Sequence, residues 1–218
     1  MDIDTAWEQR QPQFQQLWLN QQIKPCGTAY LQQIWRQIGQ LYSEPHRHYH
    51  TRTHILKCLG FFDKIRPKLV KADAVELALW YHDAIYEVGA RDNEAKSAQL
   101  FQQHAEDFLA NDLIDRVSRL ILSTTHTSSP VDSDSAYLQD IDLSSFGDSW
   151  ENFVADGDKL RHESADLSDE QYQKGKIAFF KMLIKRDRIY FTDYFYQAFE
   201  DIARTNIQRV MDQISASD

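Results

Sequence analysis

Apolar side chains recur at helical spacing along nearly the whole chain, and few residues interrupt them. In most segments an apolar residue returns after three or four positions, as one buried face of a helix requires. The 218 residues include only seven Gly and five Pro, and they show no sustained alternation of apolar and polar positions. These features argue against a many-stranded sandwich or barrel. The sequence therefore predicts an all-α fold of eight to ten helices.

Length and composition predict one compact domain. A chain of 218 residues can bury a sizeable core, and aromatic residues make up 12% of this one. We expect residues 1–218 to form a single multi-helix domain. Its core is expected at about 28–147, with an N-terminal helix and C-terminal helices packed on it. The segment SSPVDSDS (128–135) is the clearest loop, and Ser168 with Gln171 forms a capping-box pair before a later helix.

Charge and segment composition exclude several classes of partner. The net charge of −9 argues against a broad surface for a nucleic-acid polymer. The first residues do not resemble a signal peptide, and no run approaches the roughly 18 apolar residues of a membrane span. Cys26 and Cys58 have neither a disulfide framework nor metal-ligand spacing relative to each other. We expect a cytoplasmic protein with reduced cysteines and no membrane partner.

The segment ELALWYHDAIY (76–86) places a histidine on the apolar side of a predicted helix. His82 continues the apolar stripe that includes Leu79, so its imidazole should point toward the core or a cleft in it. Asp83 follows about 100° round the helix axis. A buried carboxylate is costly unless a cation or hydrogen bonds compensate it. Taken alone, a hydrogen-bonded buried pair explains these two residues better than a metal site does.

Two further predicted helices carry residues of the same types. His54 stands near the start of its helix, on the side that it shares with Cys58. Asp142 falls four residues after Leu138 on the apolar side of a short helix, whereas Asp140 lies about 200° from Leu138. Together with the His-Asp pair, these residues could surround one divalent cation. Such ligands suit Mn, Fe, Co, Ni or Zn.

His50 precedes His54 by four residues, a spacing that on one helix would place both on a single metal. If the helix begins near Thr51 or Thr53, His50 lies before it and that geometry is lost. His50 would then contact a ligand residue or the substrate. Four other histidines are expected to face solvent: His46, His48, His104 and His162.

The order of these candidates resembles the H…HD…D signature of the HD-domain metal-dependent phosphohydrolases. The resemblance covers roughly residues 42–147. It is carried by YSEPHRHYHTRTHI, WYHDAIYEV, DNEAKSA, LILSTTHT and LQDIDLSSFG, which are similar to a subgroup known only as predicted hydrolases. The resemblance implies an all-helical, HD-like core and makes Asp140 a neighbour of the site or a helix cap. It implies four metal ligands: His54, His82, Asp83 and Asp142.

The resemblance also implies a reaction. Metal-assisted hydrolysis of a phosphate ester or anhydride is expected, with a nucleotide or another small phosphorylated metabolite as the substrate. The metal would be Mn, Mg, Fe, Co, Ni or Zn, and Asp83 would both bind it and orient the attacking water. Arg47, in an R-x-Y-H context, with His50 or His126 would neutralise the developing charge. A homodimer is a possible assembly.

Two alternatives belong to other functional classes. One is an iron-dependent oxygenase of the HD superfamily, whose dinuclear centre would here need His104 or His126. The other is a non-catalytic, nucleotide-sensing HD protein. Within the family, Tyr86 and Glu87 stand where alarmone hydrolases carry Glu-Asp, and the Gly-Tyr-Pro element of the cyclic-dinucleotide subgroup is missing from the sequence. Both departures argue against those two subgroups.

Overall fold

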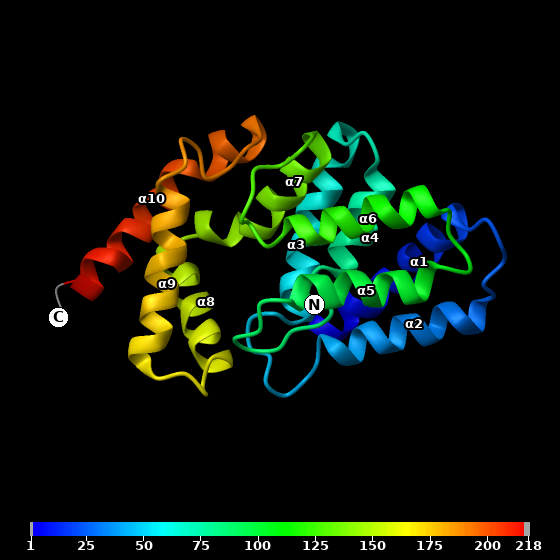
Figure 1. The fold of residues 1–218 in the computed structure, drawn as a ribbon, viewed down its shortest axis with the longest axis horizontal. Helices are drawn as coiled ribbons and strands as arrows, with labels where there is room; N and C mark the ends of the chain where they lie inside the picture. The colour runs from blue at the N-terminus through cyan, green and yellow to red at the C-terminus, as the bar shows by residue number, and fades with distance from the viewer. Residues whose placement is uncertain (1, 216–218) are drawn as a thin grey trace. The chain divides into compact units, whose positions relative to one another are not determined.

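The computed structural model describes residues 2–215, and helices dominate this part of the chain (Figure 1). In chain order the helices are α1 (Ile3–Gln21), α2 (Thr28–Leu41), α3 (Arg52–Ile65), η1 (Arg66–Lys68), α4 (Ala72–Tyr81), α5 (Asn93–Ala105), α6 (Asn111–Ser123), α7 (Ser133–Asp142), η2 (Leu143–Gly147), α8 (Trp150–Glu163), α9 (Asp169–Ile184) and α10 (Asp193–Ser215). Residues 2–215 contain no strand beyond one isolated bridge, between Gln22 and Leu109. None of their helices is both long and apolar enough to cross a membrane. The all-α prediction is confirmed.

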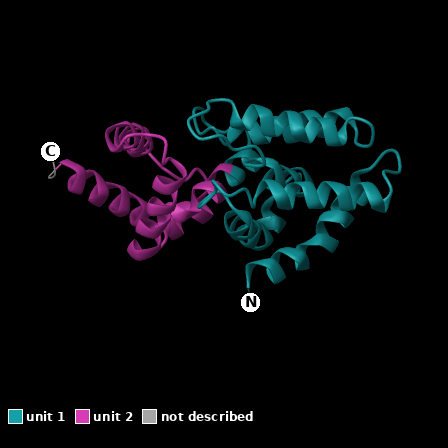
Figure 2. Ribbon diagram, turned by 90° about the horizontal axis from the view of Figure 1, so that it is seen from below, with its two compact units in different colours: residues 1–138 teal, residues 139–218 magenta. Residues whose placement is uncertain are grey.

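The chain divides into two compact units, residues 1–138 and 139–218 (Figure 2). The division falls inside α7, so this helix belongs in part to each unit. Unit 1 contains α1 to α6, and unit 2 contains η2 and α8 to α10. The single domain expected from the sequence, with a core at about 28–147, stays a prediction.

Helix α4 forms the centre of unit 1. Every residue from Ala74 to Tyr81 is buried, and α4 packs against α3, α5 and α6. The ring of Trp80 lies 5.4 Å from those of Trp7 and Phe14 and 5.5 Å from that of Trp35, measured between centroids. Apart from Glu76 this buried stretch is apolar, and a helix so apolar is stable only inside a core. Its C-terminal end is therefore a rigid base for the residues that follow.

The N-terminal end of α4 is fixed by a buried carboxylate. Asp134, in the first turn of α7, is 2% exposed. Its two oxygens accept hydrogen bonds from the backbone N–H groups of Val70 and Lys71, at 2.8 and 2.9 Å. Arg116 of α6 donates to the same carboxylate at 3.2 Å. Backbone donors and a guanidinium compensate the buried charge, so Asp134 joins three elements of unit 1.

Unit 2 is built around contacts of α10 with η2 and α9. Gly147 ends η2 where a side chain would not fit, because a Cβ atom there would lie 2.5 Å from the Cβ of Phe199. The rings of Phe153 and Phe180 stack between α8 and α9, with centroids 6.2 Å apart. Before α9, Ser168 and the glutamine at N3 form the predicted capping box, which is confirmed.

Candidate metal site

His82 lies immediately after the last residue of α4. Its backbone is still helical, and its N–H donates to the carbonyl of Ala78 at 2.8 Å. The expectation that this helix continues to Tyr86 is wrong, because α4 ends at Tyr81 and a turn follows. The expectation that His82 points inward is confirmed, since its side chain is fully buried.

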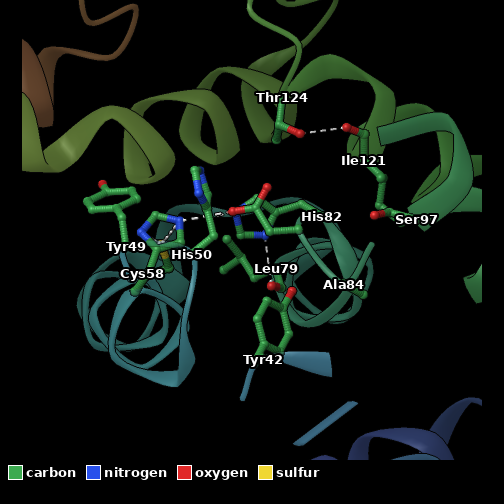
Figure 3. A network of polar contacts seen from close by, with 12 residues as sticks. Tyr42, Tyr49, His50, Cys58, Leu79, His82, Ala84, Ser97, Ile121 and Thr124 are labelled. Atoms are coloured by element: carbon green, nitrogen blue, oxygen red, sulfur yellow. Dashed lines mark hydrogen bonds and ion pairs between the residues drawn. The ribbon is translucent and has the colours of Figure 1, made fainter. Parts of the chain in front are cut away.

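A hydrogen bond determines which ring nitrogen of His82 carries the proton. Nδ1 lies 3.0 Å from the carbonyl oxygen of Leu79. Figure 3 draws this contact as a dashed line. A carbonyl oxygen only accepts, so Nδ1 must be the donor. In the neutral imidazole, Nε2 then presents its lone pair. Metal-binding histidines commonly have this arrangement, in which the second nitrogen donates to a backbone carbonyl, a carboxylate or a water molecule.

His54 approaches His82 from α3. Thr51 is the N-cap of this helix, and its hydroxyl accepts a hydrogen bond from the N–H of Thr53 at 3.3 Å. His54 consequently lies in the first turn, where it is 6% exposed. Its Nε2 is 3.3 Å from Nε2 of His82. His50 precedes the helix, so the i, i+4 geometry that would place it on one metal with His54 is lost.

Asp83 completes a triangle of donor atoms. Its Oδ2 lies 3.4 Å from Nε2 of His54 and 3.1 Å from Nε2 of His82. Ligands bound at 2.0–2.1 Å in a tetrahedral zinc site lie about 3.3–3.4 Å apart. The three measured separations, 3.1–3.4 Å, are close to this value. His54, His82 and Asp83 therefore fit a divalent cation as three ligands.

The electrostatics favour an ionised Asp83. Burial raises the pKa of its carboxyl, but without a metal the positive charges of protonated His82 and His50, and hydrogen bonds from protonated His54 and His82, outweigh burial. The pKa of Asp83 is consequently held well below its usual value. Its side chain keeps 17% of its surface exposed. The group therefore combines an anion with two imidazoles, a donor set that many divalent transition metals accept.

Two further residues, Cys58 and Asp142, offer donor atoms close to those of the two histidines. One donor atom each of His54, Cys58, His82 and Asp142 lies within 4.8 Å of the others, so these four residues could hold a metal ion. The sequence prediction did not include Cys58 among the ligands, although its i, i+4 spacing from His54 was a usable signal. Its sulfur lies 3.6 Å from Nε2 and 3.9 Å from Nδ1 of His54. Because it is nearly equidistant from both nitrogens, it lies off the axis of the Nε2 lone pair.

The two late aspartates occupy different environments. Asp142 ends α7 and is half-buried, whereas Asp140 is fully buried. The Asp140 carboxylate accepts hydrogen bonds from the N–H groups of Phe191 and Thr192, both at 2.8 Å, and from the Thr192 hydroxyl at 2.7 Å. The helix-cap alternative for Asp140 fits these contacts at the start of α10. Its position about 200° from Leu138 suggested less burial, and that inference is wrong.

Arg47 has a buried guanidinium that contacts the backbone around the triangle. It donates to the carbonyl oxygens of Asp83 at 2.6 Å, Ala84 at 2.8 Å and His50 at 3.3 Å. A further N–H donates to the carboxylate of Glu44 at 2.9 Å. A phosphate contact by Arg47 stays a prediction, whereas the contacts in the structure tie it to the backbone.

His50 lies beside the triangle within a row of rings. Its ring stacks on Tyr86 at 4.1 Å and meets Tyr49 edge to face at 5.0 Å, between centroids. The Tyr49 ring in turn lies 5.1 Å from that of His54. Since the charge of His50 also lowers the pKa of Asp83, His50 acts on the same group. This position suits the predicted contact with a ligand residue or the substrate.

The remaining histidines fall into two groups. His46, His48 and His162 are exposed as expected, but His104 is buried and that expectation is wrong. The nitrogens of His104 face the Tyr81 hydroxyl at 2.9 Å and the Gln37 amide oxygen at 3.2 Å. The polar sequence around it concealed these partners, which come from other helices. His126 is buried after α6 with a positive φ of 55°, and its role stays a prediction.

Comparisons of the chain with protein-family models, with curated proteins and with solved structures found no match.

Proposed function

We propose that this protein is a metal-dependent hydrolase of a phosphate ester or anhydride. The observation that carries the proposal is the triangle formed by Nε2 of His54, Nε2 of His82 and Oδ2 of Asp83. Its edges of 3.1–3.4 Å suit ligands of one divalent cation. His82 supports the proposal further, because its hydrogen bond to Leu79 leaves Nε2 unprotonated in the neutral ring.

The residues of the site have separate tasks in the proposed reaction. A divalent cation bound there would polarise a phosphoryl oxygen and make a water molecule more acidic. His54 and His82 would bind the cation as neutral imidazoles. Asp83, ionised at neutral pH, would bind it through one oxygen and accept a hydrogen bond from the attacking water through the other. His50, next to Asp83, would face the phosphate.

We propose further that the chain is related to the HD-domain phosphohydrolases. The support is the order His54, His82-Asp83 and Asp142, with Asp142 as an additional ligand. A nucleotide or another small phosphorylated metabolite is the proposed substrate, and no nucleic-acid polymer is proposed as a partner. The candidate metals are Mn, Mg, Fe, Co, Ni and Zn. A homodimer and a cytoplasmic location stay predictions.

A metal analysis followed by a substrate panel tests the proposal. Protein purified without chelator should contain about one divalent metal per chain. It should release phosphate from one or more members of a panel of nucleotides and sugar phosphates supplied with Mn, Mg, Co, Ni or Zn. His82→Ala should lose metal and activity, whereas the exposed His162→Ala serves as the matched control and should keep both. A folded His82→Ala protein with full metal content would contradict the site.

Iron-dependent oxygen chemistry is the alternative that the same panel distinguishes. It would require further histidine ligands for a second metal. The ring nitrogens of His104 already contact Tyr81 and Gln37, so metal binding there would break a hydrogen bond. This observation argues against His104 as a ligand, so a dinuclear oxygenase would depend on His126. Oxygen consumption by the iron-loaded protein, without release of phosphate from any ester, would reverse the choice.

A further inference from the structure

The C-terminal end of α4 leaves backbone carbonyl groups that the helix cannot satisfy. The last carbonyls of any helix lack partners within it and need donors from elsewhere. Here the Tyr42 hydroxyl donates to the carbonyl of Trp80 at 3.1 Å. Arg47 donates to the carbonyls of Asp83 at 2.6 Å and Ala84 at 2.8 Å. Two side chains that precede α3 therefore hold the end of α4 and the turn after it.

The guanidinium of Arg47 is buried between aromatic rings and backbone carbonyl groups. Its side chain has no exposed surface, and it lies over the rings of Tyr42 at 5.4 Å and Tyr86 at 5.6 Å. Its Nε donates to Glu44, which compensates the buried charge. Four hydrogen bonds use most of the five N–H groups that a guanidinium offers. A buried cation with so few remaining donors is well placed to hold backbone and poorly placed to bind substrate.

One nitrogen of this guanidinium links the two backbone segments that carry the donor triangle. Nη1 donates to the carbonyl of Asp83 and to that of His50. Asp83 is a candidate ligand, and His50 lies just before the helix that presents His54. The separation of His54 from Asp83 thus depends on a contact between Arg47 and backbone carbonyls, in which neither ligand side chain takes part.

We infer that Arg47 is a positioning residue, which holds the backbone of His50 and Asp83 so that the metal ligands converge. The inference rests on the metal site of the proposed function and replaces the phosphate contact that the sequence suggested. Lys should substitute poorly, because one ammonium group cannot span the carbonyls of Asp83 and Ala84 as a planar guanidinium does.

The test compares Arg47 with Arg52, which offers a matched control. Arg52 also donates to a backbone carbonyl, that of Gly39, at 2.9 and 3.2 Å, and it stacks on Trp7. The Zn²⁺ dissociation constant is measured by chelator competition for the parent, Arg47→Ala, Arg47→Lys and Arg52→Ala. Unfolding of each metal-free protein in urea is measured in parallel.

We expect Arg47→Ala to bind Zn²⁺ about 10- to 100-fold more weakly than the parent, as when a residue that orients a ligand is lost. Arg47→Lys should recover only part of this loss and should remain folded if the alanine variant does not. Arg52→Ala should keep its zinc affinity within about threefold, even though it loses stability.

Four results would contradict the proposal in distinguishable ways. Parent-like zinc affinity in the Arg47 variants contradicts the positioning role alone. Parent-like affinity with a slower phosphate release supports the phosphate contact instead. A parent that binds no Zn²⁺ contradicts the metal site, and the positioning role with it. An equal loss of affinity in Arg52→Ala would show that any destabilisation of unit 1 weakens metal binding.

Discussion

Asp83 in unit 1 and Asp140 in unit 2 are both carboxylates inside a helical core, but their neighbours differ in kind. Asp140 is fully buried and accepts hydrogen bonds from two backbone N–H groups and one hydroxyl. Asp83 faces the Nε2 atoms of two imidazoles at 3.1 and 3.4 Å. Amide donors satisfy an anion without any further group. Imidazole lone pairs beside an anion are stable only with a proton or a cation among them.

This contrast separates a structural carboxylate from a candidate ligand. Glu200 in unit 2 is a second carboxylate with backbone donors. Its oxygens accept hydrogen bonds from the N–H groups of Ile189 and Tyr190 at 3.0–3.1 Å and from Arg204 at 2.7 Å. We therefore expect changes at Asp140 to affect stability and changes at Asp83 to affect metal binding. Four predictions test the comparison, in order of decreasing effect.

Asp140→Ala should produce the largest effect, a loss of about 4 kcal/mol in the free energy of unfolding. Three charge-assisted hydrogen bonds disappear, and two backbone N–H groups, one buried and one part-buried, lose their acceptor. Urea unfolding of the metal-free protein measures the loss. Asp140→Asn should lose only about half as much stability as Asp140→Ala, since its amide oxygen still accepts a hydrogen bond. A loss below about 1 kcal/mol in Asp140→Ala would remove the contrast with Asp83.

Asp83→Ala should weaken Zn²⁺ binding by more than about a hundredfold, or about 2.7 kcal/mol. A direct ligand should contribute more than the residues that orient ligands, whose loss costs 10- to 100-fold. The free energy of unfolding of the metal-free protein should fall by less than it does in Asp140→Ala, because this carboxylate faces imidazoles and not amides. Chelator competition and urea unfolding measure the two quantities. A stability loss equal to that of Asp140→Ala, with normal zinc affinity, would make Asp83 a structural residue.

His104 provides a buried imidazole in unit 1 that is satisfied by hydrogen bonds rather than by an anion. Burial lowers its pKa from 6.5 to about 4. The unfolded chain therefore takes up a proton near pH 6.5 that the folded chain does not bind until about pH 4. Stability should be present above pH 6.5 and should fall by about 2 kcal/mol between pH 7 and pH 5 on this account. Urea unfolding of the parent and of His104→Gln at both pH values measures the difference, which should disappear in the variant. A parent and a variant with the same pH dependence would contradict the neutral, buried His104.

Cys58→Ala should give the smallest effect. The sulfur lies beside the His54 ring, off the axis of the Nε2 lone pair, so it should support the ring rather than bind the metal. We expect a stability loss of about 1 kcal/mol from the small cavity and a change in zinc affinity below about tenfold. Cys26→Ala is the matched control, since Cys26 is the other free cysteine of the chain. A thiolate-to-cobalt absorption band in the Co²⁺ protein that Cys58→Ala abolishes would instead make Cys58 a ligand.

The sequence alone predicted the helices and the inward direction of His82. Helical period and the scarcity of Gly and Pro were sufficient for the fold class, because both act within a few residues of the chain. The N-cap at Thr51 placed His54 in the first turn of α3 and His50 before it, one of the two arrangements that the sequence allowed. Such features depend on local backbone geometry and leave a local pattern.

Only the tertiary structure decided where α4 ends and what compensates each buried charge. The helical sequence pattern continues to Tyr86, but the chain turns after Tyr81. There Tyr42 and Arg47 donate hydrogen bonds to the backbone carbonyls of Trp80 and Asp83. The donors for Asp140 come from a segment about 50 residues later in the chain. The sequence around a carboxylate does not indicate which distant residues will donate hydrogen bonds to it. Long-range packing places backbone amides around Asp140 and imidazoles around Asp83. This difference makes Asp140 a structural residue and Asp83 a candidate metal ligand.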